Sequence, residues 1–236
     1  KNMKIEVFVI AHNEELMMPY FMKHYSQFAS VVVLENNSTD RTVQIARQWG
    51  ARVWEQDIPD FIDDQWYIDI KDNIWKSSKA DWVMIVDCDE FIYHPNLVKI
   101  LENTPETIIE PTFYEMFSER FPTTEGQIYD EVKMGCNGGS KVNLFRPGRI
   151  KEINYQGGCH NATPEGDVQF AVNTGICTLH MRFLSLQYVI DRSKHAAQRL
   201  SEFNKRTGLG FHYLWSEEEI KGHFEGHLAN STQVIL

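Results

Sequence analysis

Two aspartates and a glutamate follow one of the most apolar segments of the chain. Residues 82–86 are Trp-Val-Met-Ile-Val, and Asp87, Asp89 and Glu90 come directly after them. A continuous run of bulky apolar residues predicts a strand that is buried on both faces. Residues two apart in an extended chain point to the same side, about 6.5–7 Å from each other, so Asp87 and Asp89 can approach one ion. Oxygen ligands of this kind favour Mg²⁺ or Mn²⁺ with coordination positions left for a phosphate.

A solvated turn after a strand is the alternative interpretation of such an acidic pair. Its position favours the functional interpretation, because the acids lie at the carboxyl end of a strongly hydrophobic strand. In open α/β sheets, ligands bind at that edge. The sequence therefore predicts a divalent cation site here.

The elements that must position these acids alternate between strands and helices. This order predicts an α/β fold with a mostly parallel, mixed central sheet flanked by helices, since the crossovers between parallel strands are right-handed. Polar turns follow three of the strands and are expected to meet at one edge, at residues 12–14, 35–37 and 87–90. The expected strands cover residues 4–10, 30–34, 51–55 and 82–86, with helices over about 16–28, 38–49 and 63–78 and a loop over 58–61.

The second half of the chain has a less regular pattern. A short helix at 97–101 and a strand at 107–117 are expected, followed by a long loop at 121–136 that is a candidate lid over an acceptor. Two helices are expected near the C-terminus, over about 186–206 and 216–228.

Composition excludes several classes of function. Acidic residues outnumber basic ones by 33 to 23 in 236 residues, and no lysine-rich or arginine-rich tract is present, so nucleic-acid binding is not expected. No apolar run reaches the ~20 residues of a membrane span, and the N-terminus has no signal-peptide pattern. The glycine motifs of dinucleotide-binding proteins and P-loop NTPases are also absent. The cysteines, which form no Cys-x-x-Cys pair, indicate a reducing, cytoplasmic location; they are Cys88, Cys136, Cys159 and Cys177.

Three motifs, in this order, carry a family resemblance. They are Ile-Ala-His-Asn-Glu-Glu at 10–15, Glu-Asn-Asn-Ser-Thr-Asp-Arg-Thr at 35–42 and Ile-Val-Asp-Cys-Asp-Glu-Phe at 85–91. Together they resemble the GT-A glycosyltransferases of the family 2 type, in the subgroup whose Asp-x-Asp is followed by Glu-Phe. The resemblance implies one GT-A domain over residues 1–236, with a donor-binding half at 3–105 and an acceptor-binding half at 106–236. It also implies transfer of a sugar from a nucleotide-diphosphate donor to a glycan, a glycolipid or another hydroxyl acceptor, with inversion and with peripheral membrane contact as an option.

The resemblance also implies roles for particular residues. The diphosphate would be bridged by Mn²⁺ or Mg²⁺ on Asp89, with Asp87 nearer the ribose or a water on the metal. Glu35, Asn36 and Asn37 replace the usual Asp-Asp-Gly, which leaves the identity of the base open, with uracil the first choice. The residues expected to contact the donor are Ala11, His12, Asn13, Glu14, Glu35, Asn36, Lys71 and Asn73.

The segment from 157 to 182 contains the next group of reactive residue types. The resemblance makes His180 the third protein ligand of the metal, with Asp87 and Asp89, and His160 either its support or an acceptor contact. Arg182 or Arg192 would neutralise the departing diphosphate. A structural zinc site is the competing interpretation; its ligands would be Cys159 or His160 together with Cys177 and His180, with Cys136 as an optional fourth.

The general base that activates the acceptor hydroxyl is left open, because the Glu-Asp pair of many family 2 members is absent. Glu90, Glu152 and Asp191 are the candidates, and Asp87, Asp89, Glu90 and Asp191 form the predicted catalytic set. A nucleotidyltransferase and a non-catalytic nucleotide-sugar-binding module are the alternative functions. A nucleotidyltransferase would carry a glycine-rich first loop with Arg and Lys, which residues 11–14 do not provide.

Overall fold

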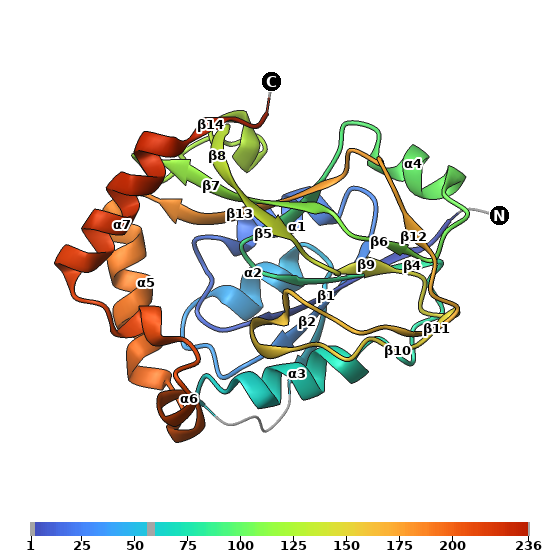
Figure 1. The fold of residues 1–236 in the computed structure, drawn as a ribbon, viewed down its shortest axis with the longest axis horizontal. Helices are drawn as coiled ribbons and strands as arrows, with labels where there is room; N and C mark the ends of the chain where they lie inside the picture. Colours follow the sequence, from blue (N-terminus) through green and yellow to red (C-terminus); the bar gives the residue numbers. More distant parts are fainter. Residues whose placement is uncertain (1–2, 56–59, 236) are drawn as a thin grey trace.

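The computed structural model describes residues 3–55 and 60–235. Its larger sheet has seven strands in the order β12-β6-β9-β4-β1-β2-β3 (Figure 1). The neighbours β4-β1-β2-β3 and β12-β6 are parallel, whereas β9 runs antiparallel to both β4 and β6. The predicted α/β class with a mixed, mostly parallel sheet is therefore confirmed. The predicted loop at 58–61 lies partly outside the described residues.

Both faces of this sheet are covered, as the apolar character of its central strands requires. On β1 (Ile5–Ala11), Val7 and Val9 belong to a core cluster shared with helices α1 (Met18–Tyr25) and α2 (Thr42–Gln48). Phe8 points to the opposite face, in a cluster that includes residues of helix α3 (Asp64–Asn73). The other strands of the sheet are β2 (Ser30–Glu35), β3 (Arg52–Glu55), β4 (Trp82–Asp87), β6 (Ile108–Ile109), β9 (Leu144–Phe145) and β12 (Phe170–Ala171).

A second sheet, which sequence patterns did not anticipate, has five strands in the order β14-β8-β7-β13-β5. Its β7 and β13 are parallel, and its other pairs are antiparallel. These strands are β5 (Glu90–Tyr93), β7 (Thr112–Ser118), β8 (Met134–Ser140), β13 (Cys177–Leu184) and β14 (Thr232–Gln233). Strand β4 belongs to the larger sheet and β5 to the smaller one, so the two sheets meet at the acidic turn.

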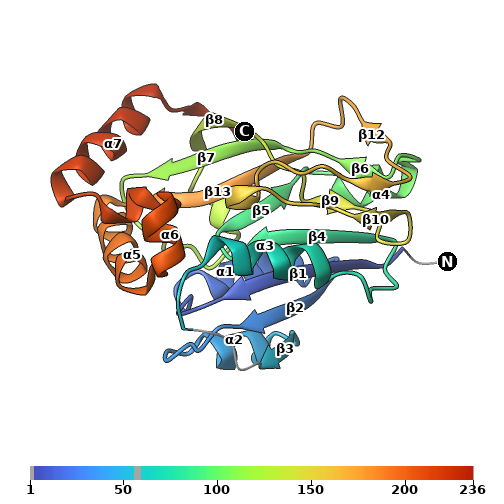
Figure 2. The same ribbon diagram turned by 60° about the horizontal axis from the view of Figure 1, so that its bottom comes forward.

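The C-terminal helices pack at one end of the smaller sheet (Figure 2). Phe117 of β7 and Phe183 of β13 form a core cluster with residues of α5 (Leu186–Arg199) and α7 (Glu217–Asn230). In the sequence, α6 (Glu202–Thr207) and the short 3₁₀ helix η3 (Phe211–Leu214) lie between α5 and α7. The remaining elements are α4 (Leu97–Asn103), the two-stranded sheet of β10 (Ile150–Glu152) and β11 (Glu165–Gly166), and the 3₁₀ helices η1 (Ile128–Asp130) and η2 (Gly157–Cys159).

Three predicted elements differ from the structure. The strand expected at 107–117 is divided around Pro111 into β6 and β7, which belong to different sheets. The helix expected at 186–206 breaks at Leu200, whose extended backbone pairs with Ile62 before Ser201 caps α6. The expected loop at 121–136 contains η1 and the first residues of β8. Each difference arises where a tertiary contact or a proline ends a local pattern.

Candidate functional site

The acidic turn lies at the carboxyl edge of the parallel strands. Register pairs Asp87 with Ile10 of β1, and Ala11 with Glu35 of β2, so the ends of the three strands are side by side. The amide of Asn36 donates to the carbonyl of Ala11 at 2.9 Å. The turns expected to share one edge therefore do so.

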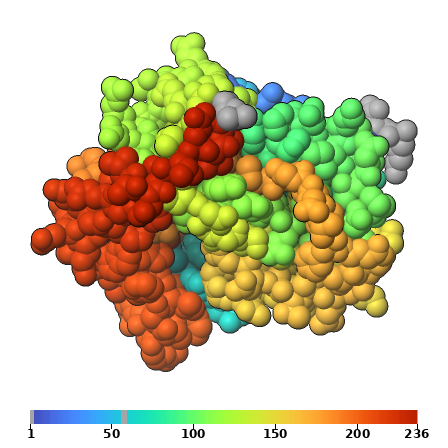
Figure 3. Space-filling model, turned by 45° about the horizontal axis from the view of Figure 1, so that its top comes forward, coloured from blue at the N-terminus to red at the C-terminus, as the bar shows by residue number. Residues whose placement is uncertain are grey.

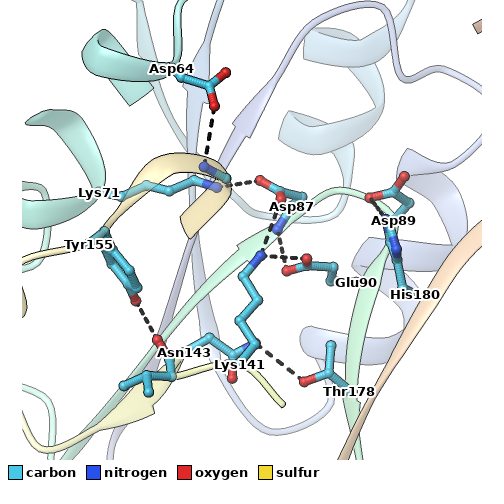
Figure 4. Close-up of polar contacts among 12 residues, drawn as sticks. Asp64, Lys71, Asp87, Asp89, Glu90, Lys141, Asn143, Tyr155, Thr178 and His180 are labelled. Atoms are coloured by element: carbon cyan, nitrogen blue, oxygen red, sulfur yellow. Dashed lines mark hydrogen bonds and ion pairs between the residues drawn. The ribbon is translucent and has the colours of Figure 1, made fainter. Parts of the chain in front are cut away.

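Asp87 is held by two buried lysines (Figure 4). Lys71 Nζ on α3 lies 2.6 Å from Asp87 Oδ1, and Lys141 Nζ lies 3.4 Å from Asp87 Oδ2. Burial tends to raise the pKa of Asp87, but the two ammonium groups outweigh it and hold that pKa well below its usual range. Asp87 is thus an ionised carboxylate whose charge is already compensated by protein cations.

Glu90 supports the turn from beneath. Its carboxylate lies 2.5 Å from Lys141 Nζ, and both side chains are 2% exposed. It also accepts a hydrogen bond from the backbone amide of Asp87 at 3.1 Å. Burial raises the pKa of Glu90, although Lys141 opposes the shift. Glu90 therefore fixes the conformation of the turn and the position of Lys141.

Asp89 points away from the lysines and toward β13 (Figure 4). Its Oδ1 lies 3.5 Å from His180 Nε2, and His180 Nδ1 lies 2.8 Å from Glu115 Oε2. The registers of β13 explain this row, because His180 pairs with Glu90 on one side and with Glu115 on the other. Burial lowers the pKa of His180, but the two carboxylates raise it to about 10.

The Asp89–His180 pair fits the ligand set of a divalent cation. Two donor atoms that each lie about 2.1 Å from one ion can be at most about 4.2 Å apart, and the observed 3.5 Å is within that limit. A carboxylate on the far nitrogen of a metal-bound histidine is also the usual arrangement, and Glu115 supplies it. When a cation is bound, His180 would be a neutral ligand and Glu115 its orienting partner.

Arg192 of α5 joins the acidic turn to the turn after β1. Its Nη2 lies 3.2 Å from Asp89 Oδ2, and its Nη1 lies 2.8 Å from Glu14 Oε2. Burial raises the pKa of Glu14 to about 7, with Arg192 opposing that shift. Tyr188 supports the guanidinium, because Nη1 donates to its hydroxyl at 3.0 Å.

The turns after β1 and β2 are connected by hydrogen bonds. Asn13 Oδ1 accepts from the amide of Thr39 at 2.7 Å, and the carboxylate of Glu35 accepts from the amide of Ser38. His12 Nδ1 lies 2.5 Å from the carbonyl of Asn36, and its Nε2 lies 3.0 Å from His195 on α5. Asn36 is fully buried, so it shapes this surface from below.

Several predicted site residues lie outside this cluster. Asn73 is exposed and donates to the carbonyl of Asp69 on its own helix at 2.7 Å, and Asp191 is exposed and accepts from Gln187 at 2.8 Å. His160 is exposed, with its ring 5.0 Å from that of Phe113, which is in turn 5.1 Å from the ring of His180. Arg182 lies over the ring of Phe183 at 5.5 Å.

Glu115 is a functional candidate that sequence reasoning missed, and Lys141, which the Gly-Gly-Ser-Lys of 138–141 indicates only as a weak phosphate contact, instead contacts the acidic turn. Lys141 follows the Gly-Gly-Ser of 138–140 and precedes an apolar segment, which is the available sign of a buried lysine. Glu115 is the single acid in an aromatic strand, Phe-Tyr-Glu-Met-Phe at 113–117, and such an acid requires a partner once it is buried.

Within residues 3–55 and 60–235, no group of three or more His, Cys, Asp or Glu side chains converges as a metal site. Asp87, Asp89 and His180 therefore do not form a three-residue set, since Asp87 faces the lysines. The zinc interpretation also lacks support in this part of the chain. Cys177 Sγ, one of its proposed ligands, instead lies 3.5 Å from the carbonyl of Tyr93.

A hollow separates the C-terminal helices from the loops that follow β8. Figure 3 shows it between the orange-to-red helices and the yellow segment near residue 150, with the cyan segment at its floor. Among the described residues, no helix is long and apolar enough to cross a membrane.

The fold and the site define an α/β protein with an acidic turn and paired lysines at the carboxyl edge of a parallel sheet. No family model matches the chain. Glucosyl-3-phosphoglycerate synthase of Petrotoga mobilis is 33% identical to it over an alignment of 109 residues, and the match covers 42% of this chain and 33% of that protein. The matched region thus spans about one third of the length of that synthase.

Solved structures with partial similarity are also found. The structure of residues 1–349 of TarS from S. aureus is one of them. The match covers 84% of this chain and 65% of the TarS chain, with 13% identity and a TM-score of 0.45. Another is a glucosyl-3-phosphoglycerate synthase from Mycobacterium tuberculosis, solved in complex with Mn²⁺, UDP and glucosyl-3-phosphoglycerate. This match covers 47% of this chain and 44% of the synthase chain, with 23% identity and a TM-score of 0.35.

Proposed function

We propose that this chain is a GT-A glycosyltransferase that moves a sugar from a nucleotide-diphosphate donor, UDP in the first instance, to a hydroxyl of a glycan or glycolipid acceptor. The observation that carries the proposal is the placement of Asp89. Its carboxylate lies between His180 and Arg192 at the edge where the turns after β1 and β2 also end. The 33% identity over 109 residues to a glucosyl-3-phosphoglycerate synthase supports a sugar-transferring enzyme.

In this proposal Asp89 and His180 hold Mn²⁺ or Mg²⁺, and Glu115 keeps the His180 ring in its orientation. When bound, the cation stabilises the negative charge that grows on the diphosphate as the glycosidic bond breaks. Asp87 remains paired with Lys71 and Lys141 and lies on the ribose side of the site. Asp89 and His180 would thus be the two protein ligands of the cation.

The donor rests on the turns after β1 and β2, with Ala11, His12, Asn13 and Glu14 on the first turn and Glu35 and Asn36 beneath the second. Arg192 is placed to neutralise charge at the diphosphate, because it already contacts Asp89. Such pre-placed cations stabilise the transition state more than the ground state, where less charge has developed. Residues 3–105 form the donor half in this proposal, and residues 106–236 form the acceptor half.

A carboxylate must take the proton of the acceptor hydroxyl if the reaction inverts the anomeric centre. Glu90 is a poor candidate because it is engaged by Lys141 and is 2% exposed, and Asp191 lies outside the site cluster, so the base stays unassigned in this proposal. The anomer of the product, assigned by NMR, tests whether inversion occurs.

Hydrolysis of UDP-sugars with and without Mn²⁺ tests the proposal. We expect Mn²⁺-dependent release of UDP that Asp89→Asn reduces by at least tenfold. The control Asp167→Asn removes a partly exposed carboxylate that pairs with Arg149, and it should leave hydrolysis unchanged. Release of pyrophosphate from nucleoside triphosphates would indicate a nucleotidyltransferase instead. UDP binding without metal dependence or turnover would indicate a binding module.

A further inference from the structure

Arg182 lies on the same face of β13 as His180. Leu179 and Met181 are fully buried, whereas His180 and Arg182 are partly exposed. Burial that alternates in this way is typical of a strand with one open face. The register of β13 against β7 shifts between His180 and Phe183, so the spacing of a regular strand does not apply to this segment. Arg182 is two residues after His180, which is part of the proposed cation site.

Arg182 differs from the other cations of the site because no carboxylate among the described residues lies within ion-pair distance of it, although its charge lowers the pKa of Glu115 on the neighbouring strand. Lys71, Lys141 and Arg192 each contact a carboxylate within 3.5 Å. In the part of the chain that the structure describes, Arg182 forms no ion pair, and its guanidinium lies over the ring of Phe183 at 5.5 Å. A partly buried guanidinium of this kind can accept an oxyanion in a bidentate contact.

Histidines from two C-terminal elements surround the same phenylalanine. The Phe183 ring lies 4.5 Å from His227 and 5.6 Å from His223, both on α7. Trp215 contacts His223 at 5.0 Å and His212 of η3 at 6.3 Å. Aromatic contacts thus connect η3 and α7 to Phe183, the ring over which the Arg182 guanidinium lies.

His212 carries a polar atom that needs a partner. Its Nε2 is buried and has no hydrogen-bond partner among the described residues. Burial, and then the charge of Arg182, lower the pKa of His212 to about 4, so at neutral pH the ring is uncharged and can donate one N–H. Buried polar atoms without a partner are rare in folded proteins and commonly mark places where a ligand or water binds.

We propose that Arg182, His212 and His223 form a subsite for an anionic group of the acceptor, a phosphate or a carboxylate. The inference rests on the proposed function, because it assigns the acceptor side of the same site. The guanidinium supplies the charge, and the imidazoles supply neutral N–H donors. An anion anchored there would direct a nearby hydroxyl of the acceptor toward the sugar held at Asp89 and His180.

Titration of the metal-free protein with inorganic phosphate and, separately, acetate tests the subsite. Histidine ring signals are followed by NMR at constant ionic strength, with EDTA present to keep the cation site empty, and are assigned with His212→Gln. We expect saturable shifts of the His212 and His223 signals. Arg182→Gln should weaken anion binding at least tenfold, and Arg182→Lys should retain part of it. Arg206→Gln, an exposed arginine on α6, should change the affinity less than twofold.

The outcomes separate the subsite from the proposed function. Saturation by phosphate alone indicates a phosphorylated acceptor, and saturation by acetate as well admits a carboxylate. Equal anion affinity in wild type and Arg182→Gln, or no saturable shift with either anion, overturns the subsite. Calorimetry of UDP with Mn²⁺ on the same variants gives the second readout, and a tenfold loss there in Arg182→Gln would assign Arg182 to the donor instead. If wild type binds no UDP, the proposed function fails, whatever the anion titration shows.

Discussion

Replacing Lys141 by methionine should strongly destabilise the fold. Lys141 and Glu90 are each 2% exposed and 2.5 Å apart, and Lys141 also lies 3.4 Å from Asp87. With Lys71, the cluster holds two cations and two carboxylates, so its formal charges cancel. Methionine matches the length of the aliphatic stem but removes the ammonium group. The variant therefore leaves the buried carboxylate of Glu90 and the partly exposed carboxylate of Asp87 facing one lysine.

Removing one partner of a buried ion pair costs about 3–5 kcal/mol, because the remaining charge stays out of water without compensation. For a chain of this size each kcal/mol lowers Tm by about 2–4 °C, which gives a loss of roughly 6–20 °C. The deficit should shrink as the pH falls, because burial already raises the pKa of Glu90 and the loss of Lys141 lets it take up a proton more readily in the variant. The double variant Lys141→Met with Glu90→Gln should recover part of the loss.

Urea unfolding followed by tryptophan fluorescence measures this free energy, since Trp75 and Trp82 are buried reporters. Lys99→Met, at an exposed position on α4, is the matched control and should change the free energy of unfolding by less than about 0.5 kcal/mol. A loss below 1 kcal/mol in Lys141→Met, similar to the control, would refute the reasoning that Lys141 compensates the buried acids.

Two further predictions concern histidines. Glu115→Gln should weaken Mn²⁺ binding about 10- to 100-fold in calorimetry, because the carboxylate no longer orients and polarises His180; unchanged affinity would remove Glu115 from the site. His24 is buried, which lowers its pKa from 6.5 to about 4, so the unfolded chain binds a proton between these values and the folded chain does not. Stability should therefore fall as pH drops from 6.5 toward 4, by about 2–3 kcal/mol more in wild type than in His24→Gln. If the free energy of unfolding fell by the same amount in both proteins between pH 7.5 and 4.5, this assignment would be contradicted.

The first half of the fold follows from local patterns. The alternation of apolar strands and amphipathic helices up to Asp87 predicts a parallel sheet, and polar turns after β1, β2 and β4 predict a shared edge. Both expectations agree with the structure, because each depends on short segments and on the general handedness of crossovers. The motif spacing is informative for the same reason.

The second half depends on contacts that no local pattern records. Strand β7 pairs with β13 across more than sixty residues, and this register is what places Glu115 beside His180. Lys141 reaches Glu90 in the same way, from a strand end 51 residues away. Alternation within a strand predicts which residues share a face but does not predict the neighbouring strand, so these partners required the structure.

The pairing of Asp87 also shows what an acidic motif leaves undetermined. Two aspartates separated by one residue can both approach an ion, yet here Lys71 and Lys141 compensate the first of them. The sequence places Lys71 near the donor but gives no sign that it contacts Asp87. The division of roles between Asp87 and Asp89 thus depends on lysines from α3 and from the residues after β8.

The central claim is that a divalent cation binds between Asp89 and His180 together with a nucleotide diphosphate. Anomalous diffraction at the manganese edge, from crystals grown with MnCl₂ and UDP, tests it most directly. The account predicts a peak within about 2.1–2.3 Å of a carboxylate oxygen of Asp89 and of His180 Nε2, with the diphosphate on the same ion. A manganese peak elsewhere, or UDP bound away from the acidic turn, would contradict it.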